Sequence, residues 1–223
     1  MTKIRFSNGH EISNCEGKLC DVYETPDQKK KLPYEAYDGL PIRCDNTWSE
    51  FDFFAAVTLN GLIGGRSPAT LYGKLWQKRK EIGKLLEKIN PECDLADPKL
   101  PWDKVKEDLR LLFDIFTGIT GIKEAITTKI LHKKREKLIP IIDSKIIEDM
   151  DLFALFGEKK SATRKANSAT DRIVQYTELI RKGLLKYTEE IEKIQRNMEQ
   201  KKYSLSKVRI FEALIWYNAE KLK

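Results

Sequence analysis

The sequence lacks any long uninterrupted run of apolar residues. A helix that spans a membrane needs about 20 consecutive, mostly apolar residues, and no segment approaches that length. The N-terminus also lacks the charged-then-apolar pattern of a secretory leader. Both absences predict a soluble, cytoplasmic protein that makes no membrane contact.

Cysteine is scarce, with four residues at Cys15, Cys20, Cys44 and Cys93. They lack the Cys-x-x-Cys spacing of a zinc ribbon, and they do not crowd near the C-terminus as an iron–sulfur site would require. A metal site from His10, Cys15, Cys20 and Cys44 can be drawn, but its spacing is loose. Reduced structural thiols are the simpler interpretation, so we expect no metal and no other cofactor.

Charge of one sign does not dominate the chain, because 41 Lys and Arg residues face 34 Asp and Glu residues and leave a net charge of +7. This moderate excess suits a polyanionic partner, but it also suits many solvated helical proteins. The 223 residues are enough for one sizeable domain with a continuous core.

The first segment, residues 1–47, is expected to be irregular. A short β-hairpin fits where residues 3–6 and 11–13 flank the turn signal Asn8-Gly9. Prolines in the remainder disfavour a helix there.

From Trp48 the apolar periodicity becomes helical, so residues 48–223 predict one helical domain. Ser67 followed by Pro68 is typical of a helix start. Further helices are expected over about 102–116, 145–156, 170–198 and 208–217. The predicted fold class is therefore mainly α.

A tight turn between two helices is expected at Gly121, within the stretch from Ile119 to Leu131. Backbone N–H groups at the start of the second helix would point outward and carry partial positive charge. Such groups can hold a phosphate oxygen, which predicts DNA contact that does not depend on base sequence.

This stretch resembles the hairpin of the helix-hairpin-helix DNA glycosylases, which reads approximately L-P-G-V-G-x-x-T-A-x-x-I-L. Ile119, Gly121, Thr127 and the pair Ile130-Leu131 correspond to its leucine, first glycine, alanine and terminal pair. The resemblance implies a helical glycosylase-like fold and double-stranded DNA as the partner.

A second motif follows in Pro140-Ile141-Ile142-Asp143. It resembles the P-h-h-D signature of the same family, at a distance from the hairpin that agrees with the adenine-specific members. The resemblance implies that Asp143 is the catalytic residue, which would stabilise positive charge at C1′ or polarise water. Asp143 is also well placed to cap a following helix, and both roles can coexist.

Two departures from the hairpin pattern matter. Thr120 replaces the proline, and Lys123 replaces the second glycine, so a lysine side chain would offer phosphate a cation in place of close backbone approach. The lysine of lyase-type members corresponds to Ala125, so the Schiff-base nucleophile is missing. The resemblance therefore implies a monofunctional glycosylase, which hydrolyses the N-glycosidic bond of a modified or damaged base without cutting the strand.

The turn and the basic residues after it form the predicted DNA-binding surface. Its members are Gly121, Ile122, Lys123, Lys129, His132, Lys133, Lys134 and Arg135. The alternative is a charged helix end that complements the helix dipole.

A flipped base needs an aromatic or apolar pocket. The aromatic candidates are Tyr34, Tyr37, Trp48, Trp76 and Trp102. The sequence does not choose among them, but Trp76 and Trp102 fall on apolar helix faces. We therefore name Tyr37 and Trp48 as base-pocket candidates.

The chain also resembles, over most of its length, an uncharacterised bacterial family. The shared stretches are residues 37–41, residues 57–63, and residues 129–135 leading to 139–144. This resemblance supports the fold and implies no activity.

Three hypotheses remain open. The leading one is a monofunctional DNA glycosylase, and the second is a non-catalytic helix-hairpin-helix DNA-binding protein, which the lysine at position 123 favours. The third, a structural or protein-interaction domain, is supported by the near balance of charges. An open, basic-rimmed cleft at Asp143 would favour the enzyme.

Overall fold

The computed structural model of the chain describes residues 2–5, 11–24, 34, 36–41, 45–59, 67–142 and 168–221. Its helices are α1 (Cys15–Tyr23), α3 (Glu50–Thr58), α4 (Pro68–Lys88), α5 (Trp102–Thr117), α6 (Glu124–His132), α9 (Ala169–Lys186), α10 (Thr188–Gln200) and α11 (Lys207–Lys221). This confirms the mainly α class. Asp143, the turn at Asn8-Gly9 and the helix expected over 145–156 lie outside the described residues.

The predicted β-hairpin strands are present as β1 (Ile4–Arg5) and β2 (Glu11–Ile12). They pair antiparallel, with Ile4 opposite Ile12. The rest of the first segment is not all irregular, because α1 forms there. This short helix was not predicted, although its apolar residues Cys15, Leu19 and Val22 recur at helical spacing and are buried.

Other predicted helix limits agree with the structure. α4 begins at Pro68 directly after Ser67, and α5 begins at Trp102. The single helix expected over 170–198 is wrong, because two helices meet at Tyr187, where φ is −114° and ψ is 32°. The Tyr187 hydroxyl donates to the backbone oxygen of Arg5, so this break lies against β1.

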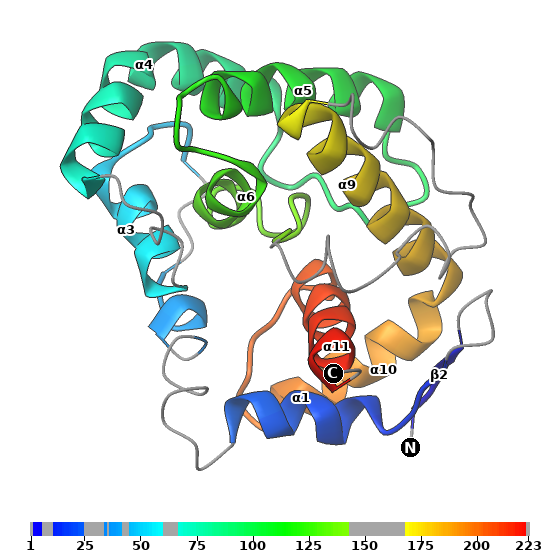
Figure 1. Cartoon of the computed structure of the whole chain (residues 1–223). Coiled ribbons are helices and arrows are strands. Elements are labelled where there is room, and N and C mark those ends of the chain that lie inside the picture. The colour runs from blue at the N-terminus through cyan, green and yellow to red at the C-terminus, as the bar shows by residue number, and fades with distance from the viewer. Residues whose placement is uncertain are drawn as a thin grey trace.

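The helices surround α6, which lies near the centre of the molecule (Figure 1). Helices α3, α5 and α9 pack directly on it, while α4 packs along α5. At the other end of the molecule, α1 packs against α10 and α11. One apolar core runs through both groups, from Ile4 to Tyr217. Within the described part of the chain, no helix has the length and apolar character needed to cross a bilayer.

Candidate functional site

The turn between α5 and α6 has the predicted conformation. α5 ends at Thr117, and the N–H of Ile122 donates to the oxygen of Ile119 at 2.9 Å. Gly121 has φ 105°, a backbone region that residues with a side chain rarely adopt. The prediction of a tight turn, with Gly121 in a conformation that would be costly for a side chain, is confirmed.

The turn that leads into α6 is partly exposed. Gly121 and Lys123 are exposed, whereas Ile122 is buried and ties the turn to the core. Lys123 occupies the N-cap position, and no side-chain hydrogen bond caps the helix there. Since the first N–H groups of a helix have no partner within the helix, this end presents donors and a partial positive charge.

Side-chain contacts fix the turn to α9. Glu124, in the first turn of α6, forms a largely buried ion pair with Arg172. The hydroxyls of Thr117 and Thr170 lie 2.8 Å apart and are hydrogen-bonded. Because both contacts flank the turn, its backbone is held in one arrangement before any ligand arrives.

The lysines predicted to contact DNA beyond the turn are buried instead. Lys129 donates to the backbone oxygen of Leu59 at 2.8 Å, and Lys133 donates to that of Leu40 at 3.2 Å. Lys134 is fully buried, with its Nζ 3.0 Å from a carboxylate oxygen of Asp52. These three cations therefore neutralise or cap interior groups, and the expectation that they form an exposed surface is corrected.

Arg135 and His132 are interior as well. The guanidinium of Arg135 donates to the backbone oxygens of Leu86, at 2.7 Å, and Ile89, at 2.9 Å, at the end of α4. His132 Nδ1 lies 2.6 Å from the oxygen of Ile139, and burial lowers the pKa of this imidazole to about 3. Their predicted role as exposed DNA contacts is corrected too. Both side chains instead fix the loop that follows α6.

The two base-pocket candidates lie inside the protein. Tyr37 is fully buried, and its hydroxyl donates to the backbone oxygen of Lys129 at 2.9 Å. Trp48 is 1% exposed and packs against Tyr72. Neither ring has a face open to a flipped base in this structure, because each is part of the packing between helices.

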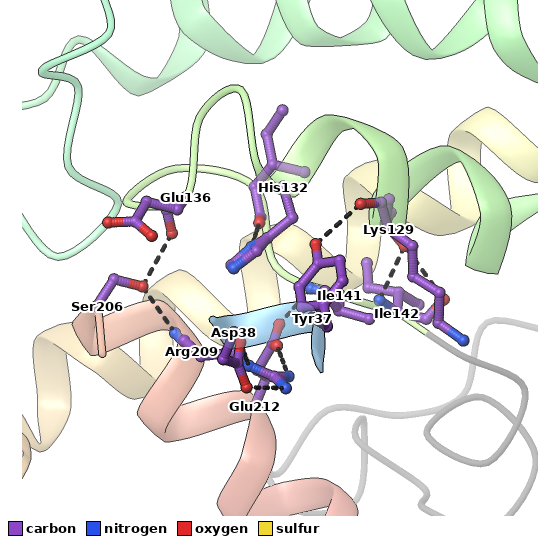
Figure 2. Close-up of polar contacts among 12 residues, drawn as sticks. Tyr37, Asp38, Lys129, His132, Glu136, Ile141, Ile142, Ser206, Arg209 and Glu212 are labelled. Atoms are coloured by element: carbon purple, nitrogen blue, oxygen red, sulfur yellow. Dashed lines mark hydrogen bonds and ion pairs between the residues drawn. The ribbon is translucent and has the colours of Figure 1, made fainter. Parts of the chain in front are cut away.

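A buried charged cluster, which the sequence analysis did not anticipate, joins the segment before α3 to α11 (Figure 2). Arg209 on α11 donates to both carboxylate oxygens of Asp38 at 2.9 Å and to Glu212 at 2.6 Å. Tyr23 donates to Asp38 at 2.9 Å. We call Tyr23, Asp38, Arg209 and Glu212 the buried cluster.

The pKa values of the buried cluster follow from burial and pairing. Burial alone would raise the pKa of Asp38, but Arg209 and Lys133 outweigh it and hold that pKa below its usual value. Burial raises the pKa of Glu212 to about 8, against the opposing effect of Arg209. Arg209 therefore donates hydrogen bonds to two carboxyl groups, and Asp38 is the one whose pKa keeps it ionised.

The buried cluster also holds the segment that leads to Asp143. The N–H of Ile141 donates to Glu212, and the N–H of Ile142 donates to the hydroxyl of Thr128 on α6 at 3.0 Å. The backbone directly before Asp143 is therefore fixed between α6 and α11.

Exposed lysines lie elsewhere in the structure, and several of them are on α4. The exposed lysines of this helix are Lys74, Lys78, Lys80, Lys84 and Lys88. Lys80, Lys84 and Lys88 follow one another at spacings of four residues, so they lie along one face of the helix.

No match to the chain was found among curated proteins or among solved structures. A match to the family of unknown function DUF6308 covers residues 17–219, and the chain belongs to that family.

Proposed function

We propose that this protein binds duplex DNA through the turn between α5 and α6. The observation that carries the proposal is the exposed turn at Gly121, which leads into a helix start without a side-chain cap. Backbone N–H groups in this arrangement suit a phosphate oxygen and read no base sequence. Lys123 adds an exposed cation at the same place.

The exposed positive charge that supports a polyanionic partner is not on residues 129–135, where it was expected. The cations between positions 129 and 135 are buried and have partners inside the protein. The exposed lysines of α4 lie on the helix that packs along α5. Several exposed cations along one helix are typical of a surface that attracts the phosphates of a nucleic acid. DNA affinity in this proposal therefore depends on the turn and α4, and not on residues 129–135.

The proposal predicts that duplex binding weakens steeply with salt, because bound cations displace counterions from DNA. Lys123→Gln is expected to reduce the slope of log affinity against log salt by about 1, and to weaken binding to different sequences alike. Gly121→Ala should also weaken binding, since a side chain at φ 105° shifts the turn. Fluorescence anisotropy with labelled duplexes at several salt concentrations measures both.

Lys104→Gln is the matched control, because Lys104 is exposed at the opposite end of α5 from the turn. It should leave affinity and slope unchanged. A flat salt response in the parent protein, or equal losses for the Lys104 and Lys123 variants, would contradict the proposal. Charge reversal at Lys134 is not a useful control, since it would bury a carboxylate beside Asp52.

We propose a second activity, hydrolysis of an N-glycosidic bond with Asp143 as the charged catalyst and without strand cleavage. The observation that favours it is the fixed backbone at Ile141 and Ile142, held by Glu212 and Thr128. A catalytic carboxylate gains from a rigidly held neighbouring backbone, because stabilising charge must be in place before the reaction begins. The alternative is a DNA-binding protein that keeps this architecture without base excision.

Asp143→Asn tests the enzyme proposal. Asparagine caps a helix about as well as aspartate but carries no charge, so base release should fall by about 100-fold or more while DNA affinity is retained. Duplexes carrying a panel of damaged or modified bases are incubated with each protein and analysed before and after alkali. Breaks should appear only after alkali, because Ala125 occupies the position of the lyase amine.

The outcomes separate the alternatives. Strand breaks without alkali would show a lyase and contradict the monofunctional assignment. No base release by the parent protein across the panel, with duplex binding intact, would leave the non-catalytic DNA-binding protein.

A further inference from the structure

Cys20 and Lys201 make an unusually close contact at the end of the molecule away from the turn. The Lys201 Nζ lies 2.9 Å from the Cys20 Sγ. That distance is typical of N–H···O hydrogen bonds, and sulfur is a larger atom than oxygen. Cys20 is 8% exposed and the Lys201 side chain is 48% exposed, so a small oxidant can approach from the lysine side.

Contacts on either side hold Cys20 and Lys201 opposite each other. One helical turn before Cys20 and Lys201, the side chain of Asn197 donates to that of Glu16. Lys201 itself also forms an ion pair with Glu24 at 3.5 Å. The backbone N–H of Lys201 donates to Met198 at 3.0 Å. The amine and the sulfur therefore meet because α1 and the end of α10 are fixed together.

The turn after Lys201 is fixed as well. Lys202 has φ 70°, a position that non-glycine residues seldom occupy without support from their surroundings. The ring of Tyr203 packs on that of Tyr23 in α1, with centroids 5.1 Å apart. These contacts hold the backbone next to Lys201 in place. The amine of Lys201 therefore needs little rearrangement to react with Cys20.

We propose that Cys20 and Lys201 are an oxidation site, at which one oxygen atom is inserted to form a covalent Sγ–O–Nζ bridge. The pair holds three exchangeable hydrogens, either as thiol and amine or as thiolate and ammonium. With dioxygen the balance is RSH + H₂NR′ + O₂ → RS–O–NHR′ + H₂O. With hydrogen peroxide, two molecules are consumed and three waters are released. Sulfur and nitrogen are oxidised, and the oxidant is reduced.

The other described cysteines lack this environment. Cys15 is fully buried, its thiol donates to the oxygen of Ile12, and burial raises its pKa to about 11. Burial also raises the pKa of Cys93. Thiols held in the neutral form react slowly with oxidants, because the thiolate is the reactive species. Because Cys20 has the amine of Lys201 in contact with its sulfur, formation of the bridge should occur there.

The bridge would join residues 181 positions apart in sequence. A cross-link that closes so long a loop restricts the unfolded chain and stabilises the fold, as a disulfide does. The melting temperature of the oxidised protein should rise by roughly 10 °C relative to the reduced protein. This inference is independent of DNA binding and base excision.

The test exposes the full-length protein to air or dilute hydrogen peroxide and measures its intact mass. The expected product has gained one oxygen and lost two hydrogens, returns to the starting mass with a thiol reductant, and yields a proteolytic fragment joining Cys20 to Lys201. Cys20→Ser and Lys201→Arg should abolish it. Lys202→Arg, which changes the adjacent lysine, should not.

Two results would overturn the inference. One is a Cys20 that stays reduced or takes up oxygen without linkage to Lys201, and the other is a cross-link that persists in Lys201→Arg. Fragment mapping of the parent protein decides the first without any variant, so it does not depend on how the variants fold. A change in intact mass that maps to another cysteine counts against the proposal.

Discussion

Replacing Arg209 with methionine is expected to lower the free energy of unfolding by about 3–5 kcal/mol. The substitution removes the only guanidinium in the buried cluster and leaves the carboxylate of Asp38 without its bidentate partner. Asp38 is held ionised largely by this arginine, so the variant must either bury an unpaired charge or protonate the carboxyl group. Glu212 loses the same partner.

Urea denaturation followed by circular dichroism measures this loss. Arg196→Met is the matched control, because Arg196 is exposed on α10 and its replacement should change stability by no more than about 0.5 kcal/mol. Equal effects from the two variants would contradict the importance given to the buried cluster. A further consequence is an altered pH dependence, since Asp38 in the Arg209 variant should take up a proton at higher pH than in the parent.

Acid is expected to destabilise the protein through His132. Burial lowers the pKa of this imidazole from 6.5 to about 3, so the unfolded chain binds the proton more readily than the folded one between these values. The stability that the neutral ring contributes is complete above pH 6.5 and is lost as pH falls through that range. The difference corresponds to about 5 kcal/mol at most.

The contribution of His132 is measured by comparison with His132→Gln, whose amide can still donate to the oxygen of Ile139 but does not titrate in this range. The difference in stability between parent and variant should shrink as pH falls from 6.5 toward 3. A difference that stays constant would show that His132 is not buried as a neutral ring. Glu212 acts in the opposite sense, because its raised pKa stabilises the fold at low pH and that contribution is lost as pH rises from 4.5 through about 8.

Features that depend on near neighbours in the sequence were predicted well. Ser67 and Pro68 start a helix through the geometry of a single turn. Gly121 was predictable because the backbone of a tight turn can require a positive φ, which glycine adopts without strain. Each of these signals lies within a few residues of the structure it specifies.

The placement of the cations after α6 could not be predicted in the same way. Lys134 is buried because Asp52, on α3, provides its counter-ion, and Lys133 because backbone oxygens of a distant segment accept its hydrogen bonds. A run of basic residues carries no sign of such partners. The sequence therefore predicted that residues 129–135 form an exposed basic surface, and this prediction was wrong. The lysines of α4, by contrast, are exposed.

The first segment was described incompletely for a related reason. The helix α1 is short, and much of its burial comes from packing against α10 and α11, more than 160 positions further along the chain. Short helices gain most of their stability from such packing and little from intrinsic propensity. The break at Tyr187 is similar, because its hydroxyl contacts Arg5 at the far end of the sequence.

The pairing of α1 with α10 and α11 has a consequence for how the chain is made. During synthesis, Asp38 leaves the ribosome long before Arg209, and Leu19 before the helices that cover it. The apolar residues of α1 and the carboxylate of Asp38 therefore stay exposed to water until α10 and α11 have been made. Contacts between such distant positions slow folding and leave intermediates open to aggregation. Loss of α11 would thus leave α1 without one of its packing partners, even though the two helices are far apart in the sequence.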